Sequence, residues 1–145
     1  MKTIHVTRTI AAPPEPIFDL LADHANYDNF RGIHRSELIR EGDPAPNGLG
    51  ALRRIKVPPL TFDEEITHFE RPLRLDYLIV KLNVPFEHPG GSITLTPENG
   101  ATRVDWRSRY RIPTPVIGGP EELVWQPLLK RGFRRVLEDI ERRLT

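Results

Sequence analysis

The sequence predicts an α+β fold in which a curved, seven-stranded antiparallel sheet wraps around one long C-terminal helix. Three observations lead to this prediction. Residues 2–10 alternate apolar and polar side chains, residues 36–112 contain six further strand patterns separated by turn residues, and residues 120–144 carry apolar side chains at helical spacing. One amphipathic helix can bury its apolar side only against the concave face of such a sheet. A cavity between the two is therefore expected, and cavities of this kind bind ligands.

Length and composition favour one soluble domain. The chain has 145 residues, of which 38% are hydrophobic and 28% charged, and its formal net charge is +1. A chain of this size forms one core, so we expect residues 1–145 to make a single domain. The small net charge gives no field that would attract nucleic acid or an anionic membrane. No segment resembles a signal peptide or a bilayer span, so we expect a cytoplasmic protein without stable membrane association.

The first part of the chain predicts one strand followed by two short helices. Residues 2–10 have the period of two that is typical of a half-buried strand. The segment 14–22 then begins with a proline, which suits a first helical turn, and has an apolar side. A second short helical turn is expected at 24–30.

Of the six strands that follow, the last has the clearest pattern. Five charged residues alternate with uncharged ones up to Ile112, so one face of this strand must be solvated. Asn99 and Gly100 precede it and indicate a tight hairpin, because both residues tolerate positive φ. The predicted strands lie near residues 36–41, 49–57, 60–69, 73–84, 91–97 and 101–112.

The C-terminal helix is predicted from its stripe of apolar residues. Gly119 can serve as its N-cap and Pro120 as its first helical residue, whereas Pro127 should kink its first turns. The stripe consists of Trp125, Leu129, Phe133, Val136, Ile140 and Leu144.

Four segments resemble the SRPBCC superfamily, which has the helix-grip fold. They are TRTIAAPPEPIFDLLADHANYDNF at 7–30, NGLGALRRI at 47–55, EEITHFERPLRLDY at 64–77 and GATRVDW at 100–106. The superfamily includes START lipid-transfer domains, the major birch pollen allergen and polyketide cyclase/dehydrase-like bacterial proteins, and the resemblance covers essentially the whole chain. It implies a fold rather than a chemistry, because no catalytic signature transfers position by position.

Candidate ligand-binding residues are those that the strand period and the helix stripe turn inward. Tryptophan and tyrosine combine apolar rings with polar tips, so several beside a serine suit a ring-bearing apolar ligand with a polar handle. Simple core packing is the alternative for at least half of the aromatic residues. The candidates are Arg53, Phe62, Glu64, Tyr77, Trp106, Ser108, Tyr110, Trp125 and Leu129.

Arg53 and Glu64 are the most informative of these residues, because inward charges are costly unless they are paired. If Pro58 and Pro59 are the central residues of the turn, Arg53 and Glu64 lie directly opposite each other. A slip of one residue would send one of them outward. The pair is expected to be a structural ion pair, and a polar anchor or an acid/base group at the cavity floor is the alternative.

No metal or cofactor is expected. The chain has no cysteine, and its five histidines do not have ligand spacing. His88 is predicted in a loop at the cavity mouth, next to a strand-entry bend at Gly90 and Gly91. The arginine row at 103–111 has no aromatic residues on its face, so this row and the basic residues of the last helix are interpreted as a solvated surface that does not bind nucleic acid.

Three functions remain open from the sequence. The first is binding of a small apolar or aromatic ligand in the internal cavity of a monomer or homodimer. The second is a cyclase- or dehydratase-type enzyme acting on a polyketide-like or other enolisable carbonyl substrate, with Glu64, His68 or Tyr77 transferring protons. The third is a co-chaperone-like module that binds a client protein through the open edge of the sheet.

Overall fold

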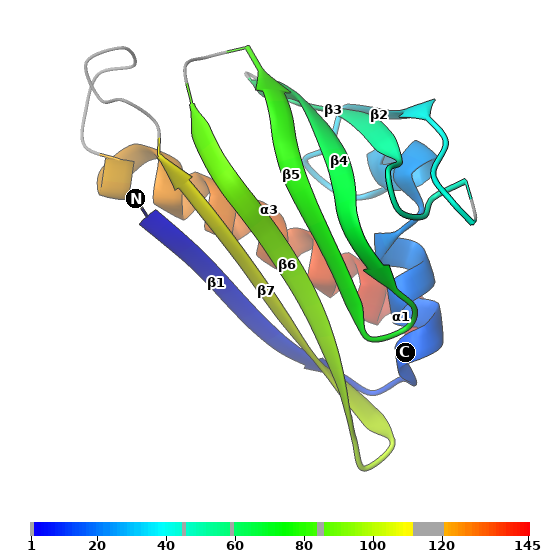
Figure 1. The fold of residues 1–145 in the computed structure, drawn as a ribbon. Helices are drawn as coiled ribbons and strands as arrows, with labels where there is room; N and C mark the ends of the chain where they lie inside the picture. The colour runs from blue at the N-terminus through cyan, green and yellow to red at the C-terminus, as the bar shows by residue number, and fades with distance from the viewer. Residues whose placement is uncertain (1, 45, 59, 84–85, 112–120) are drawn as a thin grey trace.

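The computed structural model describes residues 2–44, 46–58, 60–83, 86–111 and 121–145, without the side chains of residues 24, 25, 89 and 121–125. Seven strands form one curved antiparallel sheet, and a long helix lies against one of its faces (Figure 1). The elements are β1 (Lys2–Ile10), α1 (Pro14–Leu21), η1 (His24–Asn29), β2 (Arg35–Arg40), β3 (Leu52–Val57), β4 (Leu60–Glu70), β5 (Arg74–Leu82), β6 (Glu87–Glu98), β7 (Ala101–Arg111) and α3 (Glu121–Leu144). The predicted α+β fold, with two short helices after the first strand, is confirmed.

Consecutive strands lie side by side in the sheet, except that the segment with α1 and η1 separates β1 from β2. The order across the sheet is β1-β7-β6-β5-β4-β3-β2, so β1 pairs with the last strand and every other neighbour is consecutive in the chain. The expected hairpin between β6 and β7 is confirmed, since Asn99 and Gly100 have φ of 49° and 82°. Positive φ at both positions gives a turn whose twist matches that of the strands.

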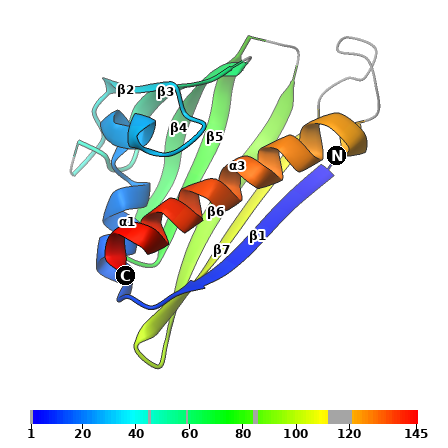
Figure 2. The same cartoon turned by 180° about the vertical axis from the view of Figure 1, so that it is seen from behind.

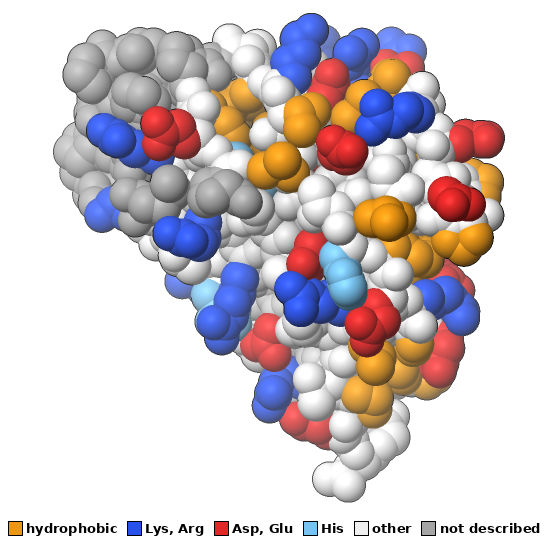
Figure 3. Space-filling view, viewed as in Figure 1, with side chains coloured by type: hydrophobic (Ala, Val, Ile, Leu, Met, Phe, Trp, Pro, Cys, Tyr) orange, Lys and Arg blue, Asp and Glu red, His pale blue; other side chains and the backbone are white. Residues whose placement is uncertain are grey.

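The two faces of the sheet differ in polarity, as the alternation in β7 predicts. Val104, Trp106 and Tyr110 are buried on the inner face, whereas Arg107 and Arg109 are exposed on the outer face. Figure 3 shows side chains of both charge signs spread over the outer face, with apolar side chains between them. The arginine row of β7 is therefore a solvated surface, as expected.

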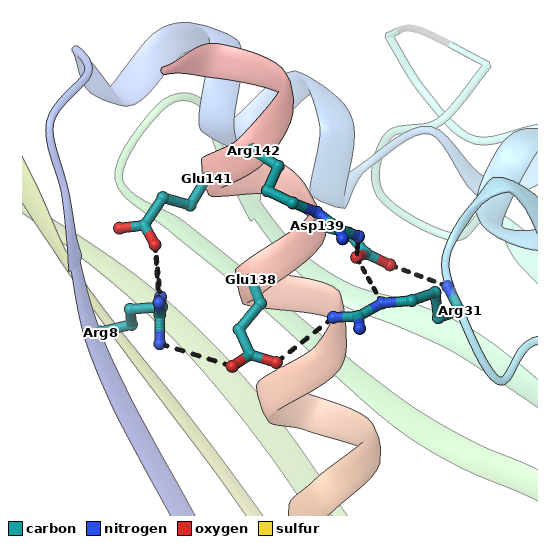
Figure 4. Close-up of polar contacts among 6 residues, drawn as sticks. All are labelled: Arg8, Arg31, Glu138, Asp139, Glu141 and Arg142. Atoms are coloured by element: carbon teal, nitrogen blue, oxygen red, sulfur yellow. Dashed lines mark hydrogen bonds and ion pairs between the residues drawn. The ribbon is translucent and has the colours of Figure 1, made fainter.

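Helix α3 is attached to the rest of the fold through its C-terminal half. Figure 2 shows it lying in front of the inner face of the sheet, on the same side as η1. Arg8 of β1 pairs with Glu141 at 2.6 Å, and Arg31 donates to the buried carboxylate of Asp139 from both its backbone N–H, at 2.8 Å, and its Nε, at 2.7 Å (Figure 4). Arg142 also pairs with Asp139. These contacts fix the helix against β1 on one side and against the segment after η1 on the other.

Some predicted strand limits are wrong. β3 begins at Leu52 rather than near 49, because Gly50 has a φ of 83°, which is outside the strand region. β6 begins at Glu87, so Gly90 and Gly91 lie inside a strand and not at its entry. The register of β6 shifts between Glu87 and Gly90, and this irregularity removes the alternation by which the first part of the strand could be predicted.

No helix in the described part of the chain combines the length and the apolar character that crossing a membrane requires. The predicted helix cap at Gly119 and Pro120 lies outside the described residues. The backbone of α3 continues through Pro127 as a single helix.

Candidate ligand-binding site

A cavity of about 290 Å³ lies between α3, the hairpin of β3 and β4, and the segment that follows η1. Its walls are mainly apolar. They include Ile55 of β3, Leu60 and Phe62 of β4, and Leu129 and Phe133 of α3. The volume is close to the lower limit of ordinary small-molecule sites, which are apolar concavities with a few fixed polar groups.

The polar groups inside the cavity are Arg53 and Glu64. These residues are direct cross-strand partners, so the predicted register of the hairpin is confirmed. Nε and Nη2 of Arg53 lie 2.6 and 2.5 Å from Oε1 of Glu64, and the two side chains are only 1% and 7% exposed. The guanidinium carbon also lies 4.4 Å from the ring centroid of Tyr27, which gives the cation a second stabilising contact.

The pKa values of both members of this pair are raised above their ordinary values. Burial raises the pKa of the Glu64 carboxyl, and the Arg53 guanidinium counteracts that effect. Burial acts to lower the pKa of Arg53, but the neighbouring Glu64 and Tyr27 raise it above its ordinary value. Arg53 is therefore a permanent cation at the cavity wall, with a carboxylate as its immediate partner.

An aromatic wall faces this pair. The rings of Trp106 and Phe133 are stacked, with centroids 4.2 Å apart and an interplanar angle of 9°. Both residues line the cavity. Nε1–H of Trp106 donates to the hydroxyl of Tyr77 at 2.8 Å, so its polar tip is already satisfied by the protein. The indole therefore contributes apolar surface to the cavity rather than a hydrogen-bond donor.

A buried polar network lies behind this wall. Nδ1 of His88 accepts from the backbone N–H of Ile79 at 3.0 Å, and Nε2 lies 2.8 Å from Oγ of Ser108. Burial lowers the pKa of His88 to about 4, so the imidazole is neutral and its proton sits on Nε2, facing Ser108. The prediction that His88 lies in a loop at the cavity mouth is wrong, since it is buried within β6.

The ring of Tyr77 lies directly against the backbone of Gly91. A β-carbon at position 91 would lie 2.3 Å from Cζ of Tyr77, so only glycine fits beside this ring. Burial and the nearby Glu64 raise the pKa of the Tyr77 hydroxyl. A phenol in this environment stays protonated, and it is held as part of the packing behind the cavity.

Five of the predicted ligand-binding residues line the cavity, and three others are buried without lining it. Tyr77, Ser108 and Tyr110 are buried but are not among the described residues that line the cavity. The side chain of Trp125 lies outside the described residues. The five residues that line the cavity are Arg53, Phe62, Glu64, Trp106 and Leu129.

His68, a candidate proton-transfer residue, lies away from the cavity. A β-bulge intervenes, because Ile66 pairs with Tyr77 whereas His68 pairs with Asp76. The extra residue reverses the alternation, so His68 turns outward, where it is half-exposed and lies 3.2 Å from the carboxylate of Glu70. Unbroken alternation from Glu64 would have kept it on the inner face.

Several cavity residues were missed in the sequence. Tyr27, Arg31, Arg131 and Arg135 line the cavity, but sequence analysis interpreted the helix arginines as solvated residues. Phe133 belonged to the apolar stripe of the helix, and its position in that stripe was the signal that could have identified it. For the arginines there was no such signal. They line the cavity because the segment after η1 packs beside α3, and this packing cannot be predicted from the sequence pattern.

No group of three or more histidine, cysteine or acidic side chains in the described part of the chain could hold a metal ion. The fold and the site together define a helix-grip protein with an internal, mostly apolar cavity. The chain matches the family described as "Polyketide cyclase / dehydrase and lipid transport" over residues 1–145, and it belongs to that family, within the SRPBCC superfamily. No curated protein matches its sequence.

Solved structures of similar fold are distant in sequence. The structure of TTHA0849 from Thermus thermophilus has a TM-score of 0.81 and 21% identity, covering 99% of this chain and 97% of that one. A START superfamily protein from Mycobacterium smegmatis has a TM-score of 0.74 and 14% identity, covering 98% and 96%. Ara h 8.0201 has a TM-score of 0.74 and 13% identity, covering 99% and 97%. At these identities the similarity establishes the fold alone.

Proposed function

We propose that this protein binds a small, largely apolar, ring-bearing molecule in the cavity between the sheet and α3. The observation that carries this proposal is the cavity itself, with apolar walls, the stacked rings of Trp106 and Phe133, and the ion pair of Arg53 and Glu64. Apolar walls supply affinity, whereas a few fixed polar groups orient a ligand. Membership of a family described by both cyclase/dehydrase activity and lipid transport supports an apolar ligand.

The position of Trp106 provides a direct test of binding. N-phenyl-1-naphthylamine, a neutral fluorescent probe, should quench tryptophan emission saturably as it fills the cavity. Because Trp106 lines the cavity, the Trp106→Phe variant should lose most of this response. If the probe causes no saturable change in the wild-type protein, the proposal is wrong.

A matched pair of leucine variants separates cavity binding from surface binding. Leu129 lines the cavity, whereas Leu73 is exposed in the turn between β4 and β5. Leu129→Glu places a charged, hydrated carboxylate among the apolar walls and should abolish binding of the neutral probe, because an apolar ligand there would have to strip water from that charge. Leu73→Glu makes the same chemical change outside the cavity and should leave the probe affinity unchanged. Equal losses in both variants would indicate binding to the surface.

Catalysis is the second candidate function, and one observation favours a particular residue. Of the three predicted proton-transfer candidates, only Glu64 lines the cavity, and burial raises the pKa of its carboxyl. A Glu64→Gln variant that stays folded and binds the ligand but no longer converts an enolisable carbonyl substrate would support this role. Unchanged turnover in that variant would exclude Glu64 as the acid or base.

A further inference from the structure

The mouth of the cavity carries an excess of positive charge. Arg31 and Arg131 are exposed and Arg135 is partly exposed, yet all three line the cavity, so they lie where it meets solvent. Glu64 is the one carboxylate among the described lining residues, and it lies inside, paired with Arg53. The charges of Arg53 and Glu64 therefore balance each other inside the cavity, and Glu64 does not offset the positive charge of the rim.

The three rim arginines differ in their partners. Arg31 is used by the protein, because its Nε lies 2.7 Å from Asp139 and its Nη2 3.3 Å from Glu138 (Figure 4). In contrast, neither Arg131 nor Arg135 forms an ion pair or a hydrogen bond with any described residue. Figure 4 shows three acidic groups near the end of α3, those of Glu138, Asp139 and Glu141, already engaged by Arg8, Arg31 and Arg142.

The spacing of the two unpaired arginines places them together. Arg131 and Arg135 are four residues apart in α3, so they lie on one side of the helix, about one turn from each other. Like charges at this spacing repel, and an anion between them would relieve that repulsion. Guanidinium groups also form strong, oriented hydrogen bonds with carboxylate, sulfonate and phosphate oxygens.

We infer that the ligand is an amphipathic acid, with an apolar ring system against Trp106 and Phe133 and an anionic group held at the rim by Arg131 and Arg135. This inference rests on the proposed function and adds the charge of the ligand to it. A neutral ligand of the same shape would keep the contacts with the walls of the cavity. It would gain nothing from the two rim cations.

The test compares two compounds that differ in charge and share a ring system. Binding of 1-naphthylacetate and 1-naphthylacetamide to the full chain is measured by isothermal titration calorimetry. The acid should bind about tenfold more tightly than the amide, the size expected from two partly exposed charge contacts. Raising the salt concentration should reduce the difference, because the rim is solvated.

Arginine variants assign this preference to the rim. The Arg131→Gln/Arg135→Gln double variant should bring the ratio of the two affinities close to one. Arg134→Gln removes an exposed arginine of the same helix that does not line the cavity, and it should keep the preference for the acid. Circular dichroism on each variant confirms that α3 is retained.

The outcomes separate this inference from the proposed function. Equal affinities of the wild-type protein for the acid and the amide would overturn the inference and leave cavity binding intact. A preference for the acid that survives in the double variant would also overturn it, because the anion would then lie elsewhere. Failure of both compounds to bind would overturn the proposed function together with the inference.

Discussion

Two neighbouring arginine–carboxylate pairs lie on opposite faces of the same hairpin. Arg53 pairs with Glu64 on the inner face, and Arg54 pairs with Asp63 on the outer face, one rung away. The inner side chains are 1% and 7% exposed, and the outer side chains are 42% and 8% exposed. Both pairs join an arginine to a carboxylate across the same two strands, and they differ chiefly in how far the cation is removed from water.

The geometry of the two pairs reflects this difference. Arg54 makes a two-pronged contact, with Nε and Nη2 lying 2.8 and 3.1 Å from the two oxygens of Asp63. Arg53 directs Nε and Nη2 to one oxygen of Glu64, and its guanidinium group also lies over the ring of Tyr27. A buried cation has lost its hydration, so only contacts within the protein can stabilise its charge. An exposed cation can replace a protein contact by water with little change in free energy.

The largest expected effect comes from breaking the inner pair. Arg53→Met or Glu64→Gln should each lower the free energy of unfolding by about 3–5 kcal/mol, because each leaves a buried charge without its partner. The Arg53→Met/Glu64→Gln double variant should lose much less than the sum of the two. Urea unfolding of all four proteins gives the coupling energy, and strictly additive losses would show that the two residues do not interact.

A pH titration extends the comparison to the buried histidine. Neutral His88 has a folded-state pKa of about 4, below the value of roughly 6.5 in an unfolded chain. Protonation therefore favours the unfolded state, so the contribution of His88 is complete above about pH 6.5 and is lost as the pH falls toward 4. The loss should reach up to about 3 kcal/mol, since one pKa unit corresponds to about 1.4 kcal/mol.

The measurement is the free energy of unfolding of wild-type protein and His88→Gln between pH 7 and pH 4.5. The stability advantage of the wild type should be greatest at pH 7 and should shrink as the pH falls. The same substitution at His68, on the outer face, serves as the control for a general effect of acid. An advantage of constant size across this range would contradict the assignment of a neutral, buried His88.

The smallest effect is expected at the outer pair. The Arg54→Met/Asp63→Asn cycle should give a coupling well below that of the inner pair, because Arg54 is accessible to water. Raising NaCl from about 0.05 to about 0.5 M should weaken this coupling further and leave the inner coupling unchanged, since salt screens exposed charges far more than buried ones. Equal salt sensitivity of the two pairs would show that water reaches both.

The sequence predicted the fold and this hairpin because both depend on local patterns. Alternation defined the strands, and the turn at Pro58 fixed which residue of β4 faces Arg53, with the register now confirmed. Where a bulge interrupts the alternation, prediction failed. His68 was expected near the cavity and lies outside, and the start of β6 was missed for the same reason.

The cavity itself was less predictable than the inner face of the sheet. Alternation tells which side chains point inward, but not which of them meet open space and which meet other side chains. Tyr77 and Ser108 are buried in contact with other side chains, Tyr77 with Trp106 and Ser108 with His88, and they do not line the cavity. Arg131 and Arg135 reach the rim through tertiary packing, which no periodicity encodes.

The contact between Tyr77 and Gly91 limits which substitutions homologues of this protein can accept at these two positions. A side chain at position 91 would overlap the Tyr77 ring, because its β-carbon would fall 2.3 Å from Cζ. A smaller residue at position 77 would open that space first, and position 91 could then change without a clash. The two positions should therefore covary among homologues, and the tyrosine should be replaced before the glycine in any lineage that loses both.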